Sequence, residues 1–185
     1  MQCTENMLNN IMNDIAKNPK VSLEQIPNID LYMDQVTTFS EEVLSSYKRN
    51  ENDKILTKTM INNYTKDKIL PPPIKKKYTK RHIILLILTY HLKSILPIQD
   101  IKILLGQLCN YDDKTVEALY TAFLEMQSST QSSFDKTLFQ LDSKLNNDEL
   151  ELILVVLNLV LQANYRKQIA EKIIDTVIRP TKNKE

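Results

Sequence analysis

Glycine and tryptophan are the residues this sequence lacks most: Gly106 is the single glycine in 185 residues, and there is no tryptophan. Tight β-hairpin turns commonly need glycine, so this scarcity argues against an all-β protein. Long periodic stretches rich in Ile, Leu, Lys, Glu and Asn favour helices instead. The composition therefore predicts an all-α fold.

Cysteine and histidine are also scarce. Cys3 and Cys109 are too few for a disulfide framework, and neither has a partner at the spacing of a metal site. His82 and His91 are nine positions apart, with no cysteine or carboxylate cluster beside them. We therefore expect no metal and no other cofactor.

Signatures of catalysis and of membrane insertion are missing as well. We find no Ser/His/Asp set, no glycine-rich phosphate loop and no paired-histidine metal motif, so we do not expect an enzyme. The polar N-terminus has no secretory signal pattern. The longest apolar run, at 150–163, would span about 21 Å as a helix, which is short of a bilayer core of about 30 Å. The sequence predicts a cytoplasmic protein without a membrane span.

Positive charge is concentrated in the middle of the chain. The net charge is only +1, but residues 57–102 hold ten lysines and arginines against Asp67 and Asp100. This segment therefore carries +8, and the remainder of the chain carries −7. Such a local excess indicates an anionic partner for the middle segment.

Apolar periodicity and breaker residues divide the chain. Asp30 is expected to cap a helix over 31–47, prolines 71–73 end a helix over 57–68, and Thr79 caps an apolar helix that we expect at the centre of the fold. The polar stretch "QSSTQSS" at 127–133 is predicted to be a linker between two helices. The predicted parts are an N-terminal helical arm (1–27), a helix-turn-helix domain (28–108), a C-terminal helical bundle for dimerisation or partner binding (109–178) and a flexible tail (179–185).

The helix over 57–68 is the predicted recognition helix of the helix-turn-helix. Its inner face would be Met60, Ile61, Tyr64 and Ile69. Its outer face would present side chains able to contact base edges or phosphates, namely Lys58, Thr59, Asn62, Asn63 and Lys66. The alternative is a surface helix whose polar side is only hydrated.

The stretch "PPPIKKKYTKR" at 71–81 places cations where a helix N-terminus normally favours acidic residues. Backbone N–H groups at such a terminus bind anions, so cations there suit a bound phosphate. The alternative is a solvated lysine run. The stretch adds six residues to the predicted DNA-binding set: Lys75, Lys76, Lys77, Tyr78, Lys80 and Arg81.

Three stretches of this region, "YTKDKILPPP", "KKKYTKRHI" and "PIQDIKILL", resemble the DNA-binding head of the MerR-type regulators. In that family a recognition helix ends in a tyrosine and a "GLLPP"-like stop, and a basic wing then leads to "YS" and a long apolar helix. The wing here is short, Lys68 stands for a family glycine, and Lys80 and Arg81 replace an acidic pair. The wider run from "PNIDLYMDQV" through "KILTKTMINNYTK" more closely resembles an uncharacterised bacterial family, known only as a domain of unknown function and described as DNA-binding.

The resemblance and the charge pattern together favour a transcriptional regulator that binds duplex DNA. The alternative is a protein-interaction adaptor that uses the same fold and turns its basic face to an acidic protein. The helix at 150–163 is polar only at Glu151, Asn158 and Gln162, so it needs cover on most sides, either from its own chain or from a second copy. We expect a homodimer. No small-molecule effector, target site or direction of regulation is indicated.

Overall fold

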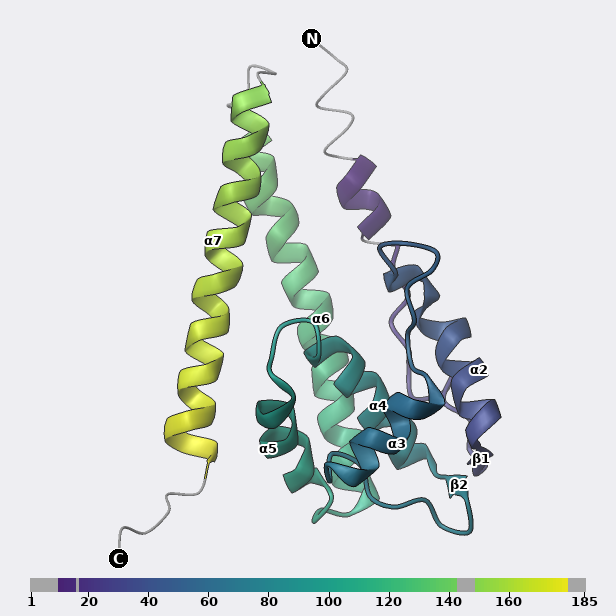
Figure 1. The fold of residues 1–185 in the computed structure, drawn as a ribbon. Coiled ribbons are helices and arrows are strands. Elements are labelled where there is room, and N and C mark those ends of the chain that lie inside the picture. Colours follow the sequence, from purple (N-terminus) through teal and green to yellow (C-terminus); the bar gives the residue numbers. More distant parts are fainter. Residues whose placement is uncertain (1–9, 16, 143–148, 180–185) are drawn as a thin grey trace, which may run out of the picture. The chain divides into compact units, whose positions relative to one another are not determined.

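The computed structural model describes residues 10–15, 17–142 and 149–179. It is mostly helical, as the composition predicted, with one two-stranded sheet. Residues 10–15 are helical, and the remaining elements are β1 (Leu31–Tyr32), α2 (Met33–Leu44), η1 (Ser45–Tyr47), α3 (Lys58–Lys66), β2 (Lys77–Tyr78), α4 (Lys80–Leu92), α5 (Ile98–Leu108), α6 (Asp113–Asp142), α7 (Glu149–Ile173) and η2 (Ile174–Ile178) (Figure 1).

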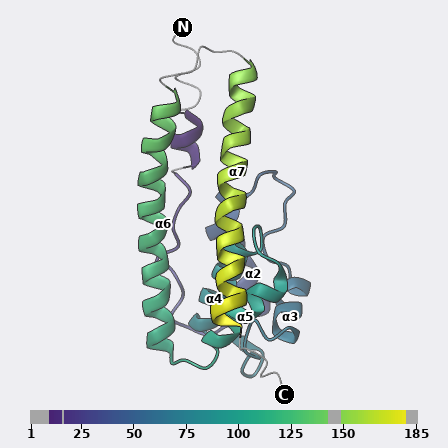
Figure 2. The ribbon, with the colours of Figure 1, turned by 90° about the vertical axis from the view of Figure 1, so that its left-hand side faces the viewer.

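The chain forms two compact units. Among the described residues, the α4 unit contains Pro19–Thr121 together with 169–179, and the α6–α7 unit contains 122–142 and 149–168 with the described residues before Pro19. Within the α6–α7 unit the two long helices run in opposite directions (Figures 1 and 2). Helices α6 and α7 each continue from one unit into the other.

Helix α4 forms the centre of the α4 unit, as its apolar sequence predicted. Every residue from His82 to Thr89 is buried. Thr79 is the N-cap residue in an extended conformation, and its N–H donates to Nδ1 of His82 at 3.0 Å. The predicted cap and the predicted core position are both confirmed.

The start of α2 differs from the prediction. Tyr32, not Asp30, is the N-cap residue, and its N–H donates to Oε1 of Gln35 at 2.9 Å. Leu31 and Tyr32 form a short strand because Leu31 is buried and pairs antiparallel with Tyr78. This pairing adds a small sheet to a fold that the sequence predicted to be purely helical.

The predicted linker at 127–133 is wrong, because α6 runs unbroken through it. The stretch contains no glycine or proline, and serine has only a modest helix penalty. Two of its hydroxyls bond to the helix's own carbonyls: Ser128 Oγ donates to Leu124 O at 2.9 Å, and Ser129 Oγ donates to Met126 O at 3.0 Å. A polar composition alone therefore did not end the helix.

Segment η2 packs against α5 within the α4 unit. Ile174 is buried, and Gln107 Nε2 donates to the carbonyl of Ile178 at 3.3 Å. Arg179 forms an ion pair with Asp100 at 3.1 Å. These contacts attach the segment that follows α7 to the α4 unit.

Candidate nucleic-acid interface

Helix α3 presents the polar face that the sequence predicted. Thr57 caps its N-terminus, accepting a hydrogen bond at Oγ1 from the N–H of Met60 at 3.2 Å. Ile61 and Tyr64 are buried and Met60 is half-buried. All five predicted recognition residues are exposed: Lys58, Thr59, Asn62, Asn63 and Lys66. The inner and outer faces of α3 are therefore placed as expected.

The end of α3 is a Schellman motif with lysine in place of the usual glycine. Lys68 has φ of 60°, the left-handed conformation. The N–H of Ile69 donates to the Tyr64 carbonyl at 2.9 Å, and the N–H of Lys68 donates to the Thr65 carbonyl at 3.1 Å. Gly106 of α5 packs beside this turn, where an added Cβ would lie 3.2 Å from the carbonyl oxygen of Lys68. The motif directs the chain away from α3 and buries Ile69 at its exit.

The lysine run forms a tight two-residue turn. The N–H of Ile74 donates to the Lys77 carbonyl at 3.0 Å, and the N–H of Lys77 donates to the Ile74 carbonyl at 2.9 Å. Lys75 and Lys76, the two central residues, have φ of 49° and 64°, as a type I′ turn requires. Both side chains are exposed. Nothing in the local sequence indicates this turn, because hairpins of this kind normally carry Asn-Gly there.

The turn is held against the fold by the β1–β2 sheet. Tyr32 pairs with Lys77, and Leu31 pairs with Tyr78. The ammonium of Lys77 also lies 5.3 Å from the centre of the Tyr32 ring, within the range of a cation–π contact. The turn and its sheet form a small wing between α3 and α4.

Tyr78, predicted to contact DNA, is buried. It is 3% exposed, and its ring stands edge-on to His82 with the ring centres 5.5 Å apart. Burial raises the pKa of the Tyr78 phenol and lowers the pKa of His82. The pair is a packing contact under the wing, so Tyr78 is withdrawn from the contact surface.

Lys80 and Arg81 also have a role that the sequence did not predict. Lys80 pairs with Glu117 at 3.3 Å, and Arg81 pairs with Asp113 at 3.2 Å. The Arg81 guanidinium in addition donates to the carbonyl of Leu108. The cations at the start of α4 therefore join it to the end of α5 and the start of α6. The sequence does not indicate these partners, because they are about thirty residues away from the two cations.

Lys58 makes a weaker contact of the same kind. Its ammonium pairs with Asp34 of α2, but the two side chains are 60% and 78% exposed. An exposed pair of this kind contributes about 0–1 kcal/mol. Lys58 thus remains available to a ligand, unlike Arg81, whose side chain is 16% exposed.

The described residues contain neither a metal site nor a membrane-spanning helix. No group of three His, Cys, Asp or Glu side chains in them is placed to hold a metal ion. None of the helices, as far as the structure describes them, offers a stretch long and apolar enough to cross a bilayer. The exposed polar face of α3 and the lysine turn present amide and ammonium groups that suit nucleic acid.

A comparison with protein-family models matches residues 21–123, more than half of the chain, to a family described as "Domain of unknown function (DUF1836)". The chain belongs to the DUF1836 family. The DUF1836 segment contains every element from β1 to α5 and ends within α6. It therefore includes α3 and the lysine turn. Membership of an uncharacterised family was predicted and is confirmed, and the family description assigns no activity. Comparisons with curated proteins and with solved structures give no match for this DUF1836 chain.

Proposed function

We propose that this DUF1836 protein is a cytoplasmic transcriptional regulator that binds duplex DNA through a MerR-like winged helix-turn-helix. Helix α3 would enter the major groove, and the Ile74–Lys77 turn would lie against backbone phosphates. One observation carries the proposal. Lys75 and Lys76 hold exposed ammonium groups at the two central positions of a turn whose backbone conformation disfavours lysine.

The backbone of the turn supports a role for the charges. A non-glycine residue in the left-handed region costs roughly 1–2 kcal/mol, so two consecutive lysines there are unfavourable for folding. Strained positions of this kind cluster at functional sites. A turn of Asn and Gly would fold more easily but would carry no positive charge. Phosphate binding gives a reason for lysine at both positions.

Helix α3 supplies groups suited to base edges. Asn62 and Asn63 are adjacent and exposed, and an asparagine amide can form two hydrogen bonds with adenine. Lys58 and Lys66 lie toward the two ends of the same helix, where they can reach guanine or phosphate. Without Tyr78, Lys80 and Arg81, the proposed contact set is Lys58, Thr59, Asn62, Asn63, Lys66, Lys75, Lys76 and Lys77.

A variant that keeps the turn and removes its charge tests the proposal. The double change Lys75→Asn and Lys76→Gly introduces the preferred type I′ residues, so the protein should fold at least as well. Each phosphate contact contributes about −0.9 to the slope of log affinity against log salt concentration. The variant should therefore flatten the slope on random duplex DNA by up to about 1.8.

The matched control is Lys102→Gln with Lys114→Gln, which removes two charges from exposed lysines of α5 and α6. It should leave the slope unchanged. Equal flattening by both double variants would show that only net charge matters. A wild-type protein that does not bind duplex DNA would overturn the proposal and favour the adaptor.

We also propose that the protein is a homodimer that uses α7. Large apolar side chains of α7 are exposed along most of its length, namely Leu150, Ile153, Leu154, Val156, Leu157, Val160, Leu161, Tyr165, Ile169 and Ile173. Contiguous apolar patches larger than a few hundred Å² are rare on monomers. Two copies would present two α3 helices to a two-fold symmetric site, about one DNA turn apart.

A further inference from the structure

A cavity of about 400 Å³ lies in the α4 unit where α4 ends. It is bordered by Tyr47 of η1, by the segment that leads into α3, and by the last residues of α4 with the turn that follows. The lining residues are Tyr47, Asp53, Lys54, Tyr90, His91, Lys93 and Ser94. The proposed DNA contacts of the wing are near the opposite, N-terminal end of α4, because β2 precedes that end directly. This volume is within the range of small-molecule sites, roughly 300–1,000 Å³.

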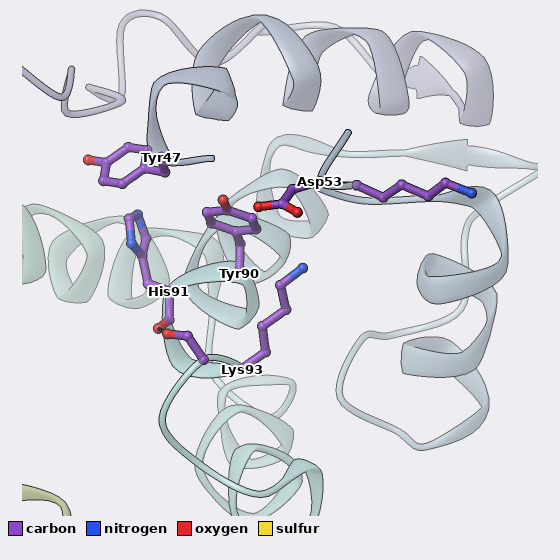
Figure 3. A pocket seen from close by; sticks show the side chains of 7 residues that line it. Tyr47, Asp53, Tyr90, His91 and Lys93 are labelled. Carbon is purple, nitrogen blue, oxygen red and sulfur yellow. Dashed lines mark hydrogen bonds between the residues drawn. The ribbon is translucent and has the colours of Figure 1, made fainter. Parts of the chain in front are cut away.

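Aromatic rings form one side of the cavity. Tyr47 stands edge-on to His91, with ring centres 5.0 Å apart, and edge-on to Tyr90 at 6.3 Å. Figure 3 shows the Tyr90 ring between the Tyr47–His91 pair and the side chains of Asp53 and Lys93. Burial lowers the pKa of His91, which favours the neutral imidazole. The rings therefore offer flat, uncharged surfaces to a planar ligand.

Lys93 supplies a cation to the same cavity. Its ammonium donates to the carbonyl of Ile55 at 2.7 Å and lies 4.7 Å from the centre of the Tyr90 ring. Within the part of the chain that the structure describes, no carboxylate forms an ion pair with it. Partial burial lowers the pKa of Lys93, because the charge is incompletely solvated. An anion in the cavity would compensate that charge.

Asp53, the acidic residue of the cavity lining, already accepts hydrogen bonds from Asn50. The carboxylate of Asp53 accepts hydrogen bonds from the N–H of Asn50 at 3.0 Å and from its side-chain amide at 3.4 Å. These bonds lower the pKa of Asp53 and fix its carboxylate in a local turn. Lys54 and Lys93 together outnumber Asp53 at the cavity, so the local charge favours an anionic ligand.

We propose that this cavity binds a small aromatic carboxylate, with the ring against Tyr90 and Tyr47 and the carboxylate on the ammonium of Lys93. Such a ligand uses the flat rings for its apolar part and, for its charge, a cation that has no ion-pair partner among the described residues. The binding site is independent of the proposed DNA-binding function.

The position of Lys93 gives the site a regulatory consequence, which rests on the proposed function. Ile55 precedes the α3 cap residue Thr57 by two positions, and both Ile55 and Leu56 are buried. The ammonium has three N–H donors, so a carboxylate on Lys93 is linked to the Ile55 carbonyl through the same group. Ligand binding therefore acts on the segment that positions the start of α3, and DNA affinity should change with it.

The test uses benzoate as the probe and the full chain in solution. His91 and His82 are the two histidines of the sequence and lie toward opposite ends of α4, so each reports on its own surroundings by NMR. Benzoate should shift the imidazole signals of His91 and leave those of His82 in place. Lys93→Gln, which keeps a hydrogen-bond donor but loses the charge, should weaken binding by about tenfold or more. Lys93→Arg should retain binding, and Lys102→Gln, the matched control, should have no effect.

The site would be overturned if millimolar benzoate did not shift the His91 signals, or if a folded Lys93→Gln variant bound benzoate as tightly as the wild-type protein. It would also be overturned if cyclohexanecarboxylate, which lacks the flat ring, bound as tightly as benzoate. Preferential binding of benzyltrimethylammonium would also overturn it, by showing a cage for cations. If benzoate binds but the protein has no affinity for DNA, the proposed function fails and the site stands. If both bind without affecting each other, the regulatory consequence fails.

Discussion

Helices α4 and α7 have similar apolar sequences and opposite surroundings. Every side chain from His82 to Thr89 in α4 is buried, whereas Leu154, Leu157 and Leu161 in α7 are 63%, 52% and 67% exposed. Burying apolar surface stabilises a fold by about 25 cal/mol per Å². The buried side chains of α4 contribute this stabilisation, whereas the exposed side chains of α7 do not contribute it within their own chain. An apolar helix sequence therefore indicates that the helix must be covered. Whether other elements of the same chain cover it depends on the rest of the sequence.

Truncation of one leucine in each helix should give the largest difference. Leu86→Ala removes a fully buried side chain of α4 and should lower the free energy of unfolding by about 2–5 kcal/mol. Leu161→Ala removes an exposed side chain and should cost less than about 1 kcal/mol at protein concentrations where the chain is monomeric. Urea unfolding followed by circular dichroism measures both. Equal losses would show that α7 is as well covered as α4.

Introducing a charge on α7 tests whether a second copy of the chain buries its exposed apolar side chains. Wild-type protein should have a mass in light scattering of about twice 21.5 kDa. Leu157→Glu would bury an unpaired carboxylate in the interface, which costs several kcal/mol, and should reduce the mass to that of one chain. Asn158→Asp adds the same charge on the half-buried polar side of α7 and should leave the mass unchanged. A wild-type mass of 21.5 kDa that does not change on dilution would contradict the dimer.

A substitution of Arg81 tests whether the cations at the start of α4 stabilise the fold or bind a phosphate. Arg81→Met keeps an apolar stem but removes the guanidinium that donates to Asp113 and to the carbonyl of Leu108. We expect a loss of about 1–3 kcal/mol in stability and no change in the salt slope of DNA binding. Lys76→Met should do the reverse, with a flatter slope and unchanged stability. A flatter slope for Arg81→Met would return Arg81 to the contact surface.

The smallest effect concerns the end of α3. Lys68→Gly should raise the free energy of unfolding by about 0.5–1 kcal/mol, because glycine adopts the left-handed conformation without strain. Lys66→Gly, two residues earlier within the helix, should lower it by a similar amount. Thermal unfolding of the two variants and of the wild-type protein measures both changes in stability. A loss of stability for both would mean that the Lys68 side chain contributes more than its backbone costs.

The features that the sequence predicted correctly depend on local patterns. The two faces of α3 follow from the helical spacing of Ile61 and Tyr64, and the start of α4 follows from Thr79. The buried position of α4 follows from apolar residues on every side. These features need only the neighbouring residues for their explanation, so a single sequence suffices to predict them.

The features that the sequence did not predict depend on distant partners or on strained backbone conformations. Arg81 meets Asp113 and Leu108 only after the chain has folded, and nothing near Arg81 in the sequence indicates either contact. The turn at Lys75 and Lys76 lacks the residues by which such turns are recognised. The polar serines of 127–133 predict a linker, whereas the hydroxyls of Ser128 and Ser129 bond within the helix.

The approach of Gly106 to Lys68 has a consequence for how the sequence can evolve. The atom that a new Cβ at position 106 would meet is a main-chain oxygen, 3.2 Å away, and every amino acid carries that oxygen. A second mutation at position 68 therefore offers no relief, because it changes a side chain and leaves the carbonyl where it is. Most packing conflicts can be repaired by a compensating substitution in the neighbour. Relief here needs a shift of a few tenths of an ångström in the main chain of α5 or of the end of α3, so the cost of a substitution at the single glycine depends on how far these two backbones can move.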